Sequence, residues 1–422
     1  MEEKRTIANI GRQVDVPEQN MHHFISVSPW SGRRMIKEVT TNIIEHPYFA
    51  QGSMLLLDES ADAKVGKVSA GVGRQYNGRL GKVEVCQVGV FLSMINNGMN
   101  CWIDGELFMP ENWFAKEQAG LRKRIGVPEE RVFETKVELG WKMIQRAQAQ
   151  GIPFDAVACD ELYGRSFTLR SQMAQADIEY YADIPVNTQV YLSQPVIGIP
   201  DAEPGPKRGR PATKTQVLSP KPYRVDQVLD QPSVFWQALT LRPTERGFLK
   251  ADFGRIRVWT VQEDLTVTEE WLLIRCDHKK TTYSLSNAPV TTPLATMALR
   301  KSQRYFVERS NQDAKSEFGW DEFQATKFIA WEHQLAFTIL AQWFIVETRL
   351  DWQERCERDP ELLQRYELTV LPTLSVANVR TLLRAALPLP QLSIPQAADL
   401  VAKHLDNRTR SRKSHLKAST DT

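Results

Sequence analysis

Three acidic residues in well-separated segments are the candidates for chemistry in this chain: Asp58, Asp160 and Glu308. The two aspartates each follow an apolar run of strand length, and the glutamate lies on a predicted helix. Mg²⁺ prefers hard oxygen ligands, so a few carboxylates and a substrate phosphate suffice to bind it. Two such ions about 4 Å apart can activate an oxygen nucleophile and stabilise the leaving oxygen of a phosphodiester. The three residues therefore predict a site for Mg²⁺, with Mn²⁺ as a substitute, that cuts phosphodiesters.

Each of these carboxylates also has a simpler interpretation. An aspartate at the end of a strand more often caps a turn than binds a metal. Arg304, Glu308 and Lys315, at offsets of 0, 4 and 11 residues, fall within roughly 40° of one another on a helix. Spacing alone favours ion pairs on a solvated face. The joint occurrence of three carboxylates in a suitable order favours the metal site instead, where Arg304 and Lys315 would hold phosphates or order the catalytic helix.

The elements that must position these residues follow from hydrophobic periodicity and turn signals. Short apolar runs without helical periodicity predict buried strands at 53–60 and 154–160. Between them, the turn signal Asn-Asn-Gly-Met at 96–99 joins predicted strands at about 85–95 and 100–108 in a hairpin. An amphipathic helix is predicted at 130–149, with four inward residues: Val132, Leu139, Met143 and Ala147.

This order of strand, hairpin, helix and strand is the opening order of the ribonuclease-H-like α/β fold. In that fold the first and fourth strands lie side by side, which would bring Asp58 and Asp160 together across 102 sequence positions. A further 148 positions separate Asp160 from Glu308, which is too many for one loop. Because much of the intervening sequence alternates in a strand-like way, we expect a ribonuclease-H-like core interrupted by a β-rich insertion.

The sequence divides into five predicted regions. They are, in order, a helical region that is a candidate for binding DNA ends (1–48), the first part of the core (49–177), the β-rich insertion (178–290), the second part of the core (291–348), and a helical C-terminal region with a basic tail (349–422). The insertion contains a predicted flexible linker near 202–222. The second part of the core contains the helix of Glu308 and then a long apolar helix at about 321–347.

The composition predicts an ordinary cytoplasmic protein. The chain is 42% hydrophobic and 25% charged, as is usual for soluble domains. It has no apolar stretch approaching about 18 residues, which predicts no transmembrane helix, and its N-terminus lacks a signal-peptide pattern. The five cysteines are scattered without a Cys-x-x-Cys pair, which argues for reduced thiols and against a structural zinc site.

Basic segments, rather than the net charge of only +2, are the candidates for contacting DNA. One is the glycine-rich stretch 64–82, whose cations are Lys64, Lys67, Arg74 and Lys82. A second, 206–211, contains Arg208 and Arg210 and resembles an AT-hook, in which arginines enter a narrow minor groove. The third is the tail at 403–417. A surface hairpin, a basic linker and a solubilising tail are the simpler interpretations. In the N-terminal region, Arg33 and Arg34 are the expected exposed cations.

Several long motifs resemble the DDE transposases of bacterial insertion sequences, closest to the insertion sequence 701 family. The first is Leu-Asp-Glu-Ser at 57–60, followed by Val-Gly-Arg-Gln-Tyr-Asn-Gly at 72–78 and Cys-Gln-Val-Gly at 86–89. The segment Asp-Glu-Leu-Tyr-Gly at 160–164 resembles the family's second-aspartate segment. Arg304, Glu308 and Lys315 match three positions of a Tyr-Arg-Glu-Lys signature. Lys301 replaces its tyrosine, and Asn311 stands where an apolar residue is more usual.

This resemblance implies that Asp58, Asp160 and Glu308 are the metal-binding triad of a transposase. Such an enzyme nicks double-stranded DNA at element ends and joins the freed 3′-hydroxyl to target DNA. It would act on the nucleoid of a prokaryote, as a homodimer when bound to DNA, because two ends must be held. Two alternatives stay open: a stand-alone Mg²⁺-dependent endonuclease, and a domesticated DNA-binding regulator without catalysis.

Overall fold

The structure is a computed structural model that describes residues 6–14, 16–64, 66–78, 80–200, 213–244, 247–277, 280–369, 371 and 374–386, with a few single positions beyond them. The chain forms two compact units, Met1–Glu347 and Thr348–Thr422. The first unit contains a large mixed sheet with helices, which confirms the predicted α/β class.

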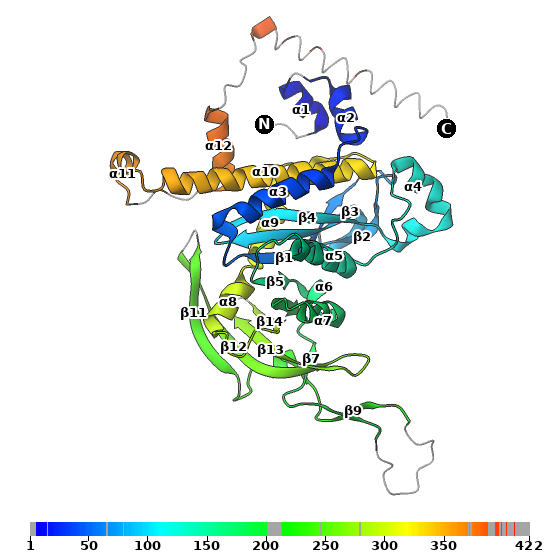
Figure 1. The fold of residues 1–422 in the computed structure, drawn as a ribbon, viewed down its shortest axis with the longest axis vertical. Coiled ribbons are helices and arrows are strands. Elements are labelled where there is room, and N and C mark those ends of the chain that lie inside the picture. Colours follow the sequence, from blue (N-terminus) through cyan, green and yellow to red (C-terminus); the bar gives the residue numbers. More distant parts are fainter. Residues whose placement is uncertain are drawn as a thin grey trace. The chain divides into compact units, whose positions relative to one another are not determined.

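The centre of this sheet is built from five strands: β1 (Met54–Ala63), β3 (Lys82–Asn96), β4 (Met99–Phe108), β5 (Ala156–Cys159) and β6 (Tyr180–Ile184). β3 pairs antiparallel with both β1 and β4, while β5 pairs parallel with β1 and β6. In Figure 1, β1 (blue) therefore lies beside β5 (green), although the two are far apart in the sequence. The predicted adjacency of the first and fourth strands is confirmed.

Five more strands extend the same sheet on its two sides: β2 (Gly73–Asn77), β11 (Phe235–Thr244), β12 (Gly247–Val261), β13 (Val267–Cys276) and β14 (Thr281–Ser286). β2 pairs with β3, and β14 pairs antiparallel with β6, so that the sheet continues from β6 to β11. Two small two-stranded sheets are also present, formed by β7 (Gln189–Val190) with β10 (Tyr223–Arg224) and by β8 (Val196–Gly198) with β9 (Gln216–Ser219).

The predicted hairpin is present and is closed by the residues that the turn signal named. Asn97 and Gly98 connect β3 to β4 with φ angles of 43° and 83°. Asparagine and glycine adopt such positive angles at lower cost than other residues, and two-residue hairpins favour them for this reason.

Helices cover both faces of the central strands. On one face lies α5 (Lys136–Ala149), where Gly140 allows the side chain of Leu57 to approach closely. On the other face lie α8 (Leu294–Ser302) and α9 (Tyr305–Ser316), whose Met297 and Val307 pack in one buried cluster with Leu56. Strand alternation explains this division, since neighbouring residues of β1 point to opposite faces. The remaining helices of this unit are α1 (Ile7–Gln13), α2 (Glu18–Ser26), α3 (Gly32–Glu45), α4 (Ala119–Ile125), α6 (Glu161–Gly164) and α7 (Phe167–Gln175).

The start of α5 differs from the prediction. The helix begins at Lys136, because Thr135 and Glu138 form a reciprocal capping box that fixes its first turn. Leu139, Met143 and Ala147 are buried as expected, but the prediction that Val132 faces inward is wrong, since Val132 precedes the helix and is 62% exposed.

The long apolar helix, α10, spans Phe328–Arg355 and so begins later than the predicted position of about 321. A left-handed Gly319 and a single 3₁₀ turn at Trp320–Glu322 precede it. In the second unit, α11 (Pro360–Tyr366) and α12 (Val376–Ala386) follow. Among the described residues, no helix combines the length and the apolar character that crossing a membrane requires.

Candidate active site

The pairing of β1 with β5 places Asp58 and Asp160 next to each other. Leu57 and Cys159 are the last partners in the parallel register, and β5 ends there while β1 continues to Ala63. The aspartates that follow these two partners thus lie where one strand ends and its neighbour runs on. Both line a cavity of about 860 Å³.

Asp160 has the capping role that the simpler interpretation predicts, and it also lines the cavity. It is the N-cap of α6, and its Oδ1 accepts hydrogen bonds from the backbone N–H groups of Leu162 at 2.9 Å and Tyr163 at 3.4 Å. These bonds fix the carboxylate against the end of the strand. Within the described part of the chain no group donates to its Oδ2, so capping leaves one oxygen available to the cavity.

Asp58 is held through both of its oxygens. Oδ1 accepts the backbone N–H of Glu59 at 2.9 Å, and Oδ2 accepts from Nδ2 of Asn311 at 3.3 Å. The Oδ1 of Asn311 in turn accepts from the indole Nε1 of buried Trp102 at 3.1 Å. Because an indole N–H can only donate, Trp102 sets the orientation of the Asn311 amide and aims its NH₂ at Asp58. The unusual polar residue at position 311 therefore positions the first aspartate.

Glu59 is a residue of this site that the sequence analysis missed. Ligand oxygens of Asp58, Glu59 and Asp160 all lie within 4.8 Å of one another, and we call these three residues the carboxylate cluster. Strand alternation argues against such a meeting, because Glu59 points toward α5, where its Oε1 pairs with Nζ of Lys136 at 3.0 Å. The β1–β5 pairing ends at Leu57 and Cys159, so no residue of β5 lies between the side chains of Asp58 and Glu59. The adjacent Asp-Glu pair in the sequence was the only signal for it.

Burial and like charge act together on the cluster. Burial, then the charges of Asp160 and Glu59, raise the pKa of Asp58 well above its ordinary value. Burial, followed by the charge of Glu59, also raises the pKa of Asp160, although Arg304 and the two N–H groups of α6 act in the opposite direction. Without a bound cation, these surroundings therefore favour the protonated form of both carboxyl groups more than water does.

Glu308 lies on α9 and lines the same cavity, but it stands outside the cluster of three. Its side chain is 61% exposed, and its Oε1 pairs with Nη2 of Arg304 at 3.0 Å. Arg304 is held in place by a second acid, because its Nε donates to Oδ2 of Asp183 on β6 at 3.0 Å. Asp183 also receives Nζ of Lys301 at 2.6 Å. The lysine that replaces the signature tyrosine is thus buried beneath Arg304.

Lys315 lines the cavity and belongs to the same helix as Glu308, as predicted. Its Nζ is engaged with the far end of β1, where it pairs with Oδ1 of Asp62 at 3.0 Å and donates to the carbonyl oxygen of Ala61 at 2.7 Å. These contacts tie α9 to β1. They support the interpretation of Lys315 as a residue that orders the helix.

The carboxylate cluster fits a hard divalent cation. Its members offer oxygen ligands only, a set that suits Mg²⁺, Mn²⁺ or Ca²⁺ and not Zn²⁺ in a structural site. In addition, Oε2 of Glu59 is buried and has no hydrogen-bond partner in the part of the chain that the structure describes. A buried carboxylate oxygen without a donor is costly, and a cation would satisfy it.

The predicted DNA-contacting cations are found in different environments. The assignment of Lys64 is wrong: the residue is buried, and its Nζ donates to the carbonyl oxygen of Phe323 at 2.6 Å. Lys67, Arg74 and Lys82 are exposed, as a contact with DNA requires. Arg208 and Arg210 lie outside the described residues, as does most of the basic tail.

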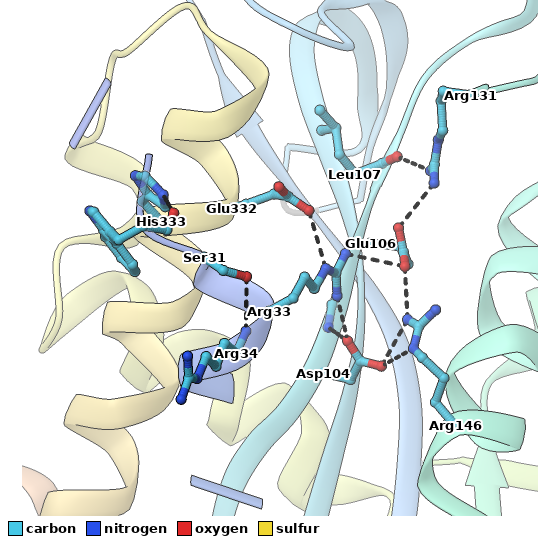
Figure 2. A network of polar contacts seen from close by, with 12 residues as sticks. Ser31, Arg33, Arg34, Asp104, Glu106, Leu107, Arg131, Arg146, Glu332 and His333 are labelled. Atoms are coloured by element: carbon cyan, nitrogen blue, oxygen red, sulfur yellow. Dashed lines mark hydrogen bonds and ion pairs between the residues drawn. The ribbon is translucent and has the colours of Figure 1, made fainter. Parts of the chain in front are cut away.

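The expectation that Arg33 is exposed for DNA reading is also wrong. Figure 2 shows its guanidinium turned toward two acids of β4. It pairs with Asp104 at 2.8 Å and Glu106 at 3.2 Å, and with Glu332 of α10 at 3.1 Å. Two more arginines contact the same acids, and we call the whole set the β4 ion network: Arg33, Asp104, Glu106, Arg131, Arg146 and Glu332. Only Arg34 of the pair is exposed.

Comparison with known proteins identifies the family of this chain. The model of the DDE superfamily endonuclease family matches residues 1–247 of the chain. A protein of Microchaete diplosiphon described as a probable transposase for insertion sequence element IS701 is 25% identical over 331 residues, which cover 77% of this chain and 73% of that protein. Asp58 and Asp160 lie inside the family match, and Glu308 lies C-terminal to it.

Proposed function

We propose that this chain, which belongs to the DDE superfamily endonuclease family, is a DDE-type transposase. Such an enzyme nicks DNA at element ends and joins the freed 3′-hydroxyl to target DNA. One observation carries this proposal. Asp58 and Asp160, 102 positions apart in sequence, meet in a cavity that Glu308 lines from a third element. Cutting DNA with metal ions requires carboxylates that meet in this way, because each ion must contact more than one of them.

The fold that we propose for the catalytic core is ribonuclease-H-like. The order β4-β3-β1-β5-β6, antiparallel on one side of β1 and parallel on the other, supports it. The insertion predicted at 178–290, between core segments 49–177 and 291–348, would then begin after β6 (Tyr180–Ile184), because that strand belongs to the core order. Strands β11 to β14 of the insertion join the sheet at β6, so they extend the core rather than stand apart from it.

In the proposed mechanism, Asp58 and Asp160 would hold Mg²⁺, or Mn²⁺ in its place, and Glu308 of α9 would complete the ligand set. When bound, the metal activates a water or a 3′-hydroxyl and stabilises the leaving oxygen. Asn311 keeps Asp58 in place through its bond to Oδ2. Arg304, held by Asp183, lies beside Glu308 and is positioned to meet a substrate phosphate.

The DNA would approach along the β2 side of the cavity. Tyr76 of β2 lines the cavity and Arg74, two residues earlier on the same exposed face of the strand, lies beside it. Lys67 and Lys82 are exposed in the same segment. Phosphate contacts by these cations would make affinity fall steeply with salt. Two ends must be held for joining, so the active assembly on DNA would be a homodimer acting in the prokaryotic nucleoid.

The first test is Asp58→Ala in the full-length protein. We expect Mg²⁺-dependent cleavage of element-end DNA to fall at least about a thousandfold, since a metal ligand is lost, while DNA affinity stays within about threefold, because affinity comes mainly from cations. Cleavage at the wild-type rate by this variant would overturn the proposal.

A second test separates transposase from its alternatives. Pre-nicked element ends are incubated with a supercoiled target plasmid, and products are resolved on a gel. Joined products establish strand transfer. Hydrolysis alone, by a monomer and without preference for particular ends, identifies a stand-alone nuclease. Specific binding with neither reaction identifies a DNA-binding regulator without catalysis.

A further inference from the structure

We propose that Glu59 is a metal ligand of this site, so that the first cation is held by Asp58, Glu59 and Asp160 before Glu308 and DNA contribute. This inference rests on the proposed function, because it assigns one more ligand to the same centre. It also divides the acids of the cavity into two groups: a cluster that binds a cation in the free protein, and Glu308, which joins later.

The geometry favours Glu59 over Glu308 as the third ligand of the first cation. Oxygens of Asp58, Glu59 and Asp160 lie within 4.8 Å of one another, a span that one ion can bridge, and Glu308 is not part of that group. Glu59 follows Asp58 directly on β1, and its backbone N–H bonds to Oδ1 of Asp58, so the Asp58 carboxylate is fixed against the backbone of Glu59. Glu308 is 61% exposed and pairs with Arg304.

The two oxygens of Glu59 have different environments. Oε1 is neutralised by Nζ of Lys136 at 3.0 Å. Oε2 is buried and has no hydrogen-bond partner among the described residues. The hydroxyl of buried Tyr163 also has no hydrogen-bond partner among the described residues, and it lies close enough for Glu59 to raise its pKa, so it is a competing donor to this carboxylate. It does not offset the repulsion that Glu59 meets from two other carboxylates, because a hydroxyl carries no charge. An oxygen that receives a cation explains this position.

The charge of the cluster matches one divalent ion. Three carboxylates face the single ammonium of Lys136, which leaves a net formal charge of −2. Arg304 does not balance it, because that guanidinium already serves Asp183 and Glu308. Hard carboxylate oxygens on a partly buried wall are the ligands that Mg²⁺ and Mn²⁺ prefer.

The competing explanation is structural: Glu59 and Lys136 join β1 to the start of α5 and do nothing else. Four variants distinguish the two. Glu59→Gln removes the proposed ligand but keeps its shape. The double variant Glu59→Gln with Lys136→Met removes the whole ion pair, so no buried ammonium is left unpaired. Glu308→Gln tests the other acid, and Lys136→Met alone is the control for losing the pair.

The experiment is Mn²⁺ binding to the full-length protein without DNA, measured by calorimetry and by the electron paramagnetic resonance signal of free Mn²⁺. We expect the wild type to bind one ion at millimolar concentration or below. Both variants that carry Glu59→Gln should bind it at least about tenfold more weakly, since even the loss of an outer partner costs a metal site 10–100-fold. Lys136→Met and Glu308→Gln should stay within about threefold of the wild type, because neither removes a ligand of this ion.

Two results would overturn the inference: wild-type affinity in the double variant, or no Mn²⁺ binding by the wild type without DNA. Asp58→Asn, measured alongside, keeps the two proposals apart. If Asp58→Asn loses the ion and Glu59→Gln retains it, the proposed function stands and Glu59 is only an ion-pair residue. If Asp58→Asn also retains the ion and still cuts DNA, the proposed active site itself is wrong.

Discussion

Two groups of acids, one buried and one partly buried, lie at the same sheet and differ in the number of cations that contact them. In the β4 ion network, Asp104 and Glu106 face the guanidinium groups of three arginines at 2.8–3.2 Å (Figure 2). In the carboxylate cluster, the ion pair of Glu59 with Lys136 is the one that the three acids form among the described residues, and Arg304 acts on the two aspartates through its charge. Both lie beside α5, which contributes Arg146 to the first and Lys136 to the second.

The pKa of Glu106 reflects this difference, whereas burial raises the pKa of Asp104 although Arg146 and Arg33 act in the opposite direction. Burial alone would raise the pKa of Glu106, but Arg33, Arg146 and Arg131 hold it below its ordinary value. For Asp58, burial and the neighbouring acids raise the pKa, although Arg304 acts in the opposite direction. A buried acid that the protein has paired is a structural element, whereas one that it has left uncompensated is prepared for a cation from outside. For Glu106 and Asp58, the number of cations that contact the acid separates the two roles.

The largest effect is expected in the β4 ion network. Arg33→Met leaves Asp104, Glu106 and Glu332 with one cation fewer, and breaking buried pairs costs about 3–5 kcal/mol. Because Arg33 is 35% exposed, we expect the lower end, about 3 kcal/mol, in urea unfolding. The neighbouring exposed Arg34→Met is the control and should change stability by less than about 0.5 kcal/mol. Equal effects of the two variants would remove the distinction between the two regions.

A smaller effect is expected where the structure positions an acid of the cluster. Asn311→Leu keeps the side-chain size but removes the amide between Trp102 and Asp58. We expect Mg²⁺-dependent cleavage to fall about 10–100-fold, or about 1.4–2.7 kcal/mol in the barrier, with DNA affinity retained. Gln312→Leu, at an exposed position that also lines the cavity, is the matched control. A loss that is equal in both variants would assign the effect to the cavity wall in general.

Removing a charge from the carboxylate cluster should stabilise the protein, whereas removing one from the β4 ion network should destabilise it. Asp58→Asn removes one of three crowded charges, so we expect the metal-free protein at neutral pH to gain about 1 kcal/mol, as stabilising substitutions at active sites commonly do. Since the pKa of Asp58 is raised in the folded state, the wild type loses stability as pH rises from the ordinary aspartate pKa through the raised one. The advantage of the variant should therefore vanish as pH falls below about 3.9, the ordinary aspartate value.

Thermal unfolding across pH measures this change, and Mg²⁺ provides the control. The cation should raise the unfolding temperature of the wild type and leave Asp58→Asn nearly unchanged, because only the wild type retains the ligand. If the asparagine variant were less stable than the wild type at neutral pH, the negative charge of Asp58 would have to be compensated by groups other than those described.

The smallest stability effect is expected for Glu308. Its side chain is 61% exposed and its pair with Arg304 spans one helical turn, a type of surface pair worth less than about 0.5 kcal/mol. Glu308→Gln should therefore unfold within about 0.5 kcal/mol of the wild type, although we expect its cleavage activity to be lost. A destabilisation comparable to that of Arg33→Met would place Glu308 with the structural acids.

Local sequence determined the elements that carry the site. The apolar run before Asp58, the Asn97-Gly98 turn and the inward face of Leu139, Met143 and Ala147 were all predicted, because strand alternation, turn angles and helix periodicity act over a few residues. The meeting of Asp58 and Asp160 was also predictable, since the order of the elements leaves few ways to pair them.

Tertiary structure alone decided which charges are balanced. Lys64 and Arg33 read as exposed cations in the sequence, but they are turned inward by a carbonyl of Phe323 and by the acids of β4. Glu59 joins Asp58 because β5 ends one residue too early to separate the two faces of β1. The physical reason is the same in each case: the free energy of a buried charge depends on partners brought from distant segments, and no local pattern contains them.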